Sequence, residues 1–121
     1  MRESFIAIIL ILLPAFVSAS TLNPPWKRVY KKPGYEFWYN TSSVKYFGQI
    51  IDVDVWEVRP ESASLKRIRF DRTNGQVAIA TAKGYKYDKL VADFDFTNNG
   101  YVYGKAYNEY RLLFKKLNAA P

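Results

Sequence analysis

A strictly alternating stretch at residues 49–59 constrains the fold of this chain more than any other feature of its sequence. Apolar side chains occupy every second position, and two aspartates and a tryptophan lie between them: Ile51, Val53 and Val55 against Asp52, Asp54 and Trp56. A period of two places successive side chains on opposite faces of a strand, whereas a helix repeats about every 3.6 residues. The stretch therefore predicts a half-buried β-strand.

Further strands are predicted on both sides of this one. Trp26 and Val29 are expected to open a first strand, and aromatic or alternating runs typical of strands follow at 35–39, 44–47, 65–72, 76–82, 85–96 and 101–103. Asn74 and Gly75 are predicted to form a hairpin turn, because Asn-Gly supplies the positive φ angles that match strand twist. Gly84 is expected to separate two strands. The order of these runs favours an antiparallel meander.

The last segment changes period. Residues 105–117 place apolar side chains at spacings of four, three and four, namely Ala106, Tyr110, Leu113 and Leu117. This spacing predicts an amphipathic helix, and Lys115 and Lys116 lie where the helix dipole favours cations. The predicted fold class is therefore α+β: a small antiparallel β-sheet of five to seven strands in a meander, with a C-terminal helix packed on it.

The absence of cysteine and histidine excludes several classes of site. The chain has no residues for a disulfide, a Cys/His zinc site, a thiol nucleophile or a Ser-His-Asp triad. A hydrophobic core must therefore hold the domain together, and the 17% of aromatic residues provide large apolar surfaces for it. Carboxylate chemistry, a Ser-Lys pair or binding without chemistry remain, and we expect neither a cofactor nor a metal.

The first 19 residues have the layout of a secretory signal peptide. Arg2 precedes an apolar run at 5–13, Pro14 follows, and small residues precede a cleavage position after Ala19. Counted through Val17, the apolar run is about 13 residues, against the roughly 20 that span a bilayer. A retained membrane anchor is the alternative. We expect a signal peptide at 1–19 and one exported α+β domain at 20–121, in the periplasm, on the cell surface or secreted, with no transmembrane span.

The charge of the chain favours anionic partners. The formal net charge is +7, and residues 1–19 contain one arginine and one glutamate, so the exported domain keeps this excess. A basic domain is attracted to anionic glycans, lipid headgroups and nucleic acid. Export makes nucleic acid the least accessible of these. The expected partners are extracellular proteins or anionic glycans and surfaces, without nucleic acid, and a dimer through an exposed edge strand is left open.

Two clusters mix basic and aromatic side chains in a way that suits recognition. Rings supply contact area at low entropic cost, and lysines supply long-range attraction. The alternative is a solvated face with half-buried tyrosines. The candidate binding residues are Trp26, Lys27, Arg28, Lys31 and Lys32 in the first cluster and Lys83, Tyr85, Lys86, Tyr87 and Lys89 in the second.

Two groups of carboxylates are candidates for sites of chemistry. Asp52 and Asp54 lie on one face of a strand, about 7 Å apart, which is within the range that glycosidases use. Arg67 and Arg69 share a face of the next strand, however, and a cross-strand ladder of ion pairs accounts for all four residues. The run at 93–104 begins like a calcium loop but lacks the glycine and glutamate that such a loop needs, so it predicts a strand and a turn.

Short motifs in the first half resemble a known family. They are Trp26 in a proline-rich leader, the run Tyr39-Asn40-Thr41-Ser42-Ser43-Val44, Gly48, and Val53-Asp54-Val55-Trp56. With the export signal, they resemble the bacterial surface-adhesin protein E family over residues 22–72. The resemblance implies a small antiparallel sheet with a helix at or beyond the cell envelope, and characterised members are adhesins for host matrix and plasma proteins. Arg72 replaces a cysteine that is paired in the family, and Asn40 replaces the usual aspartate.

Three functions follow from these observations. The leading hypothesis is an exported, non-enzymatic binding module of the cell envelope or medium, adhesin-like, for extracellular or anionic partners. The alternative is an envelope or periplasmic accessory structural protein with no dedicated ligand. The third is a small hydrolase that uses Asp52 and Asp54, which requires a cleft around them and raised carboxyl pKa values.

Overall fold

The computed structural model describes residues 25–119, so the expected signal peptide at 1–19 lies outside the described residues. The chain forms a seven-stranded antiparallel sheet and one C-terminal helix, as the sequence predicts. The strands are β1 Trp26–Lys32, β2 Tyr35–Asn40, β3 Lys45–Phe47, β4 Ile50–Val58, β5 Ser62–Asp71, β6 Val77–Lys86 and β7 Lys89–Asp95, and the helix is α1 Asn108–Asn118. Short 3-10 turns follow β2 at Thr41–Ser43 and β7 at Thr97–Asn99.

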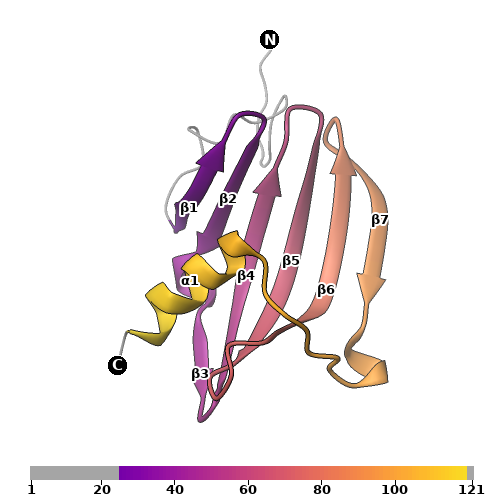
Figure 1. The fold of residues 1–121 in the computed structure, drawn as a ribbon. Helices are drawn as coiled ribbons and strands as arrows, with labels where there is room; N and C mark the ends of the chain where they lie inside the picture. The colour runs from indigo at the N-terminus through magenta and orange to yellow at the C-terminus, as the bar shows by residue number, and fades with distance from the viewer. Residues whose placement is uncertain (1–24, 120–121) are drawn as a thin grey trace.

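The sheet is a meander with one interruption. Its strand order is β1-β2-β4-β5-β6-β7, and β3 pairs with the first half of β4 beyond the end of β2 (Figure 1). Every pairing is antiparallel. As a result, the β1–β2, β4–β5 and β6–β7 turns all lie at one end of the sheet, the upper end in Figure 1. We call this the three-turn end.

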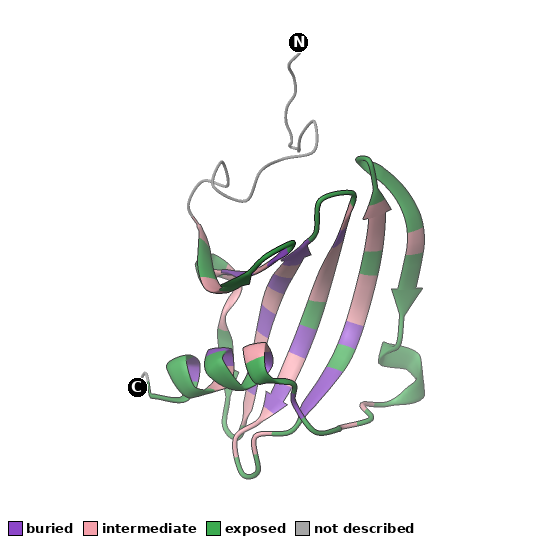
Figure 2. Ribbon diagram, turned by 45° about the horizontal axis from the view of Figure 1, so that its top comes forward, coloured by how far each residue is buried: buried purple, intermediate pink, exposed green. Residues whose placement is uncertain are grey.

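The core lies between α1 and one face of the sheet, which we call the helix face. The alternating apolar residues of β4 point toward α1, together with Phe37 of β2 and Ile68 and Phe70 of β5. Tyr110, Leu113 and Leu117 of the helix complete this core. The helix crosses the β1, β2 and β4 side of the sheet and does not cover β7, which is almost entirely exposed (Figure 2). On the opposite face, which we call the open face, residues 25–119 place no helix.

The structure corrects two turns. The strand is not broken at Gly84, because β6 runs through it to Lys86 and turns at Tyr87 and Asp88. These are the only described non-glycine residues with positive φ, at 48° and 67°. Gly84 instead lies opposite Ala92 next to a register shift. The turn after β5 is a hairpin connection as predicted, but only Gly75 has a positive φ there, so it is not a two-residue Asn-Gly turn.

Three element boundaries also differ. Residues 101–103 form no strand, and only Gly104 makes an isolated bridge, to Val77. The helix begins at Asn108 rather than at residue 105, although Ala106, just before it, is buried as the spacing indicates. At the other end of the chain, the basic leader is itself the edge strand β1, because all of residues 26–32 except Val29 pair with β2.

The helix contributes to stability through one buried stripe, which a matched pair of substitutions tests. Leu113 is 0% exposed and its neighbour Leu112 is 46% exposed. Leu113→Ala is expected to lower the free energy of unfolding by about 2–5 kcal/mol, because it removes buried methyl groups and leaves a cavity. Leu112→Ala is expected to change it by less than about 0.5 kcal/mol. Urea denaturation measures both, and equal effects would contradict the packing of α1 described above.

Candidate binding surface

The open face carries a band of aromatic side chains. Trp38 of β2 lies opposite Trp56 of β4, and Trp56 lies opposite Leu65 of β5. The Trp56 ring centroid is 6.4 Å from that of Trp26 and 5.7 Å from that of Tyr85, so the band runs from β1 to β6. Trp38 is buried beneath these rings, and its Nε1 has no hydrogen-bond partner among the described residues. We call Trp26, Trp38, Trp56 and Tyr85 the aromatic band.

Cations lie at both ends of the aromatic band. Arg28 lies opposite Trp38, with its guanidinium 5.8 Å from the ring centroid, and its Nη1 is 3.2 Å from Glu36 Oε1. On the other side, Lys83 lies opposite Leu65 and is exposed. This part of the open face combines apolar contact area with an exposed lysine and an arginine that is paired with Glu36.

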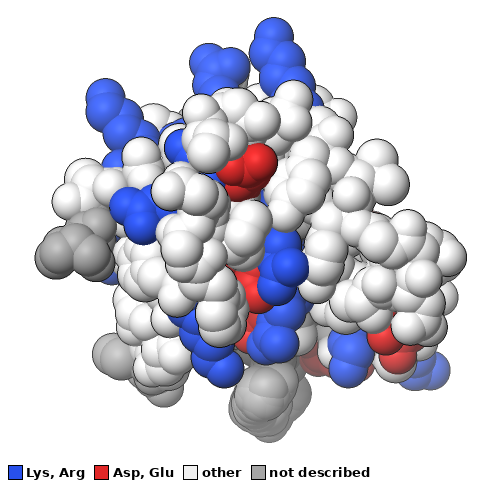
Figure 3. Space-filling model, turned by 90° about the horizontal axis from the view of Figure 1, so that it is seen from below, with Lys and Arg blue, Asp and Glu red and all other residues white. Residues whose placement is uncertain are grey.

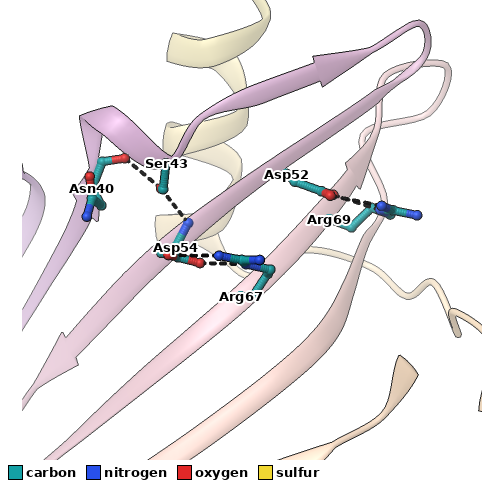
Figure 4. Close-up of polar contacts among 6 residues, drawn as sticks. All are labelled: Asn40, Ser43, Asp52, Asp54, Arg67 and Arg69. Atoms are coloured by element: carbon teal, nitrogen blue, oxygen red, sulfur yellow. Dashed lines mark hydrogen bonds and ion pairs between the residues drawn. The ribbon is translucent and has the colours of Figure 1, made fainter. Parts of the chain in front are cut away.

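The lower half of the open face is a ladder of ion pairs, as the sequence predicts. Asp52 lies opposite Arg69, and Asp54 lies opposite Arg67. Each pair has two hydrogen bonds, at 2.7 and 2.8 Å for Asp52–Arg69 and at 2.9 and 3.3 Å for Asp54–Arg67 (Figure 4). These bonds raise the pKa of both arginines. The two carboxylates are thus bound to fixed cations, which disfavours acid/base catalysis by either.

Neighbouring groups hold this ladder in place. The Arg69 guanidinium lies 4.1 Å from the Tyr101 ring centroid, which covers it from the segment after β7. Ser43 Oγ accepts a hydrogen bond from the Asp54 backbone N–H and donates one to the Asn40 carbonyl oxygen (Figure 4). The Asn40 side chain also caps the 3-10 turn by accepting from the Ser42 N–H. The run of turn-forming residues at 40–43 therefore has a structural role at this position.

The three-turn end gathers cations from distant parts of the sequence. Lys31 and Lys32 lie before the β1–β2 turn, Arg59 follows β4, and Lys86 and Lys89 flank the β6–β7 turn. Glu61 and Asp88 lie in these turns, Glu36 lies opposite Lys31, and Arg59 Nη1 is 3.9 Å from Glu57 Oε1. At the opposite end of the molecule, the acidic side chains lie beside basic ones (Figure 3). The three-turn end therefore has an excess of positive charge that its own carboxylates do not balance.

The turns at this end are tied to one another. The Tyr87 backbone N–H donates to the Glu61 carbonyl oxygen at 3.2 Å, which joins the β6–β7 turn to the β4–β5 turn. A hydrogen bond to the Glu61 side chain raises the pKa of the Tyr87 hydroxyl. The Tyr35 ring lies beneath two cations, 4.9 Å from the Arg59 guanidinium and 5.5 Å from Lys32 Nζ.

A buried polar cluster beneath α1 anchors the helix to the sheet. Glu57 of β4 is 6% exposed. Both of its carboxylate oxygens are 3.2 Å from Lys66 Nζ, and it accepts a hydrogen bond from the Tyr110 hydroxyl at 2.5 Å. Tyr35 donates to Glu109 at 2.9 Å beside this cluster. Burial, with the charge of Glu57 as a smaller cause, raises the pKa of Tyr35 and of Tyr110 far above 10.0. Because every partner is hydrogen-bonded, this cluster is structural.

The structure separates the ten predicted binding residues into three groups. Lys31, Lys32, Lys86, Tyr87 and Lys89 meet at the three-turn end. A second group lies on the open face: Trp26, Arg28, Lys83 and Tyr85. Lys27 lies opposite Tyr39 and so belongs to the helix face of the edge strand.

Sequence reasoning missed two residues of this surface. Arg59 was not counted because it stands alone in the sequence, beyond a strand end and before Pro60. Trp56 was placed on the open side of its strand, but it was not linked to either cluster. The alternation of residues 51–56 places Trp56 on the same face as the aspartates. This alternation is visible in the sequence and was sufficient to include Trp56 among the residues of the surface.

Comparisons with known proteins leave the family open. No protein-family model, curated protein or solved structure matches the chain. The resemblance to the surface-adhesin protein E family therefore stays a prediction. No helix in residues 25–119 is long and apolar enough to cross a membrane.

The polar cluster predicts a change in stability with pH. The folded chain holds the Tyr110 proton more tightly than the unfolded chain, so this contribution is complete below pH 10 and is lost as the pH rises above 10. Tyr110→Phe is expected to lower the free energy of unfolding by about 1–3 kcal/mol near neutral pH, because Glu57 loses a donor. It is also expected to flatten the loss above pH 10. Denaturation at several pH values measures both effects, with the exposed Tyr107→Phe as the control.

The two rungs of the ladder are expected to differ in strength. The Arg69 and Asp52 side chains are 24% and 17% exposed, against 55% and 25% for Arg67 and Asp54. Double-mutant cycles with alanine should give a coupling energy below about 1 kcal/mol for Asp54–Arg67, which is typical of exposed pairs. The Asp52–Arg69 coupling should be larger, because Tyr101 shields it from water. An Asp52–Arg69 coupling energy equal to or smaller than that of Asp54–Arg67 would show that the cover by Tyr101 does not strengthen the ion pair.

Proposed function

We propose that this chain is an exported, non-enzymatic binding module that recognises anionic partners through the three-turn end and the adjoining aromatic band. The observation that carries the proposal is that cations from two clusters more than fifty residues apart meet at one end of the sheet, with Arg59 between them. The aromatic band adds contact area beside these charges. Rings flanked by accessible cations are typical of recognition surfaces.

The two aspartates considered for chemistry, and the buried Glu57, are all bound by other side chains of the chain. Asp52 and Asp54 are bound bidentately by arginines, and Glu57 is held by Lys66 and Tyr110. These contacts support a binding role over a hydrolytic one. The adhesin-like form of the proposal, and a place in the periplasm, at the cell surface or in the medium, rest on the signal-like segment and the family resemblance.

Binding of residues 20–121 to a panel of extracellular-matrix proteins and sulfated glycans tests this function. We expect saturable binding at physiological salt that weakens steeply as salt rises, because the attraction is largely electrostatic. A variant with Lys31, Lys32, Lys86 and Lys89 changed to glutamine should lose about tenfold or more in affinity.

The matched control removes the same charge elsewhere. Lys105, Arg111, Lys115 and Lys116 are exposed residues in and before α1, away from the three-turn end. Changing these four residues to glutamine should reduce affinity by less than threefold. Equal losses in the two variants, or weak binding of every polyanion only at low salt, would refute a dedicated surface. That result would favour the structural accessory protein.

A further inference from the structure

We infer that the three-turn end is a site for a linear sulfated polysaccharide, which lies across the strand ends and contacts all three turns. This inference rests on the proposed function and names its ligand class. It depends on the geometry of the cations, which the net charge alone does not determine.

The turns of the three-turn end, each of which carries at least one cation, form a row with a regular spacing. Neighbouring strands lie about 4.8 Å apart, and each turn is two strands away from the next in the order β1-β2-β4-β5-β6-β7. The turns therefore repeat at about 10 Å, and the row is about 20 Å long. Each turn contributes at least one cation: Lys31 and Lys32, then Arg59, then Lys86 and Lys89. A row of this kind matches a linear chain that carries an anionic group on each repeating unit.

Each turn is held rigid by local features of the chain. Lys32 precedes Pro33 and Arg59 precedes Pro60, and proline fixes the backbone of a turn. The third turn is held by the positive φ angles of Tyr87 and Asp88 and by the Tyr87 hydrogen bond to the Glu61 backbone. Rigid turns lower the entropic cost of binding an extended ligand. The Arg59 side chain is 46% exposed, and its guanidinium, whose Nη1 is 3.9 Å from Glu57 Oε1, can also donate to a sulfate.

The surroundings of the row favour a sugar chain over a lipid surface. Glu61 and Asp88 lie within the turns that carry the cations. A flat anionic membrane would press against these carboxylates, whereas a linear chain can pass along the cations beside them.

A series of heparin oligosaccharides of two to ten sugars tests the inference by calorimetry at physiological salt. Affinity should rise with length until the chain spans about 20 Å and then level off, because three turns are then occupied. Arg59→Gln removes the middle contact and should reduce the affinity of the long oligosaccharides at least fivefold while changing that of the disaccharide less than twofold. Arg59→Lys keeps the charge and should restore most of the loss, and thermal unfolding of each variant checks the fold.

Several outcomes would overturn the inference. Equal affinity for the shortest and longest oligosaccharides would indicate a single-turn site. If Arg59→Gln leaves the affinity unchanged, the ligand does not run across all three turns. If the protein binds phosphatidylserine vesicles more tightly than any oligosaccharide, its ligand is a lipid surface. In these cases the proposed function stands with a different ligand. If no anionic probe binds at physiological salt, the proposed function fails as well.

Discussion

The structure depends on one constraint: a single short helix must cover a seven-stranded sheet. An 11-residue helix is about 16 Å long, while six strands side by side span about 24 Å. The helix therefore packs on the β1, β2 and β4 side, over a core that takes its fully buried sheet residues from β2, β4 and β5, and Glu57 fixes its first turn through Tyr110. The open face and the β6–β7 side must remain stable in contact with water.

The open face meets this requirement in two ways. Its lower half pairs every aspartate of β4 with an arginine of β5, so that charges cover the strands without being left unpaired. Its upper half uses aromatic rings, which bury Trp38 while leaving Trp26, Trp56 and Tyr85 partly accessible. The same rings that protect the sheet are therefore available for contact with a partner.

The local spacing of apolar residues was sufficient to predict the strands and the helix. The ladder could be predicted because each of its two strands carries charges of one sign on one face. The errors arose where nonlocal pairing decides the outcome. Gly84 was expected to break a strand, but β5 and β7 flank it on both sides and hold it in the sheet. Residues 101–103 have strand-like composition, but only Gly104 reaches a partner. The link between Arg59 and the lysines required the strand order, which no single segment contains.

The strained backbone of the β6–β7 turn lies within the proposed binding site. Tyr87 and Asp88 both have left-handed backbone angles, which cost about 1–2 kcal/mol per residue for L-amino acids other than glycine. Asn-Gly, the pair best suited to such a turn, occurs instead after β5, in a longer connection where only Gly75 has a positive φ. A strained turn persists only when its surroundings hold it, and here Glu61 does so. The strain therefore lies between Lys86 and Lys89, at the point where the row of cations ends.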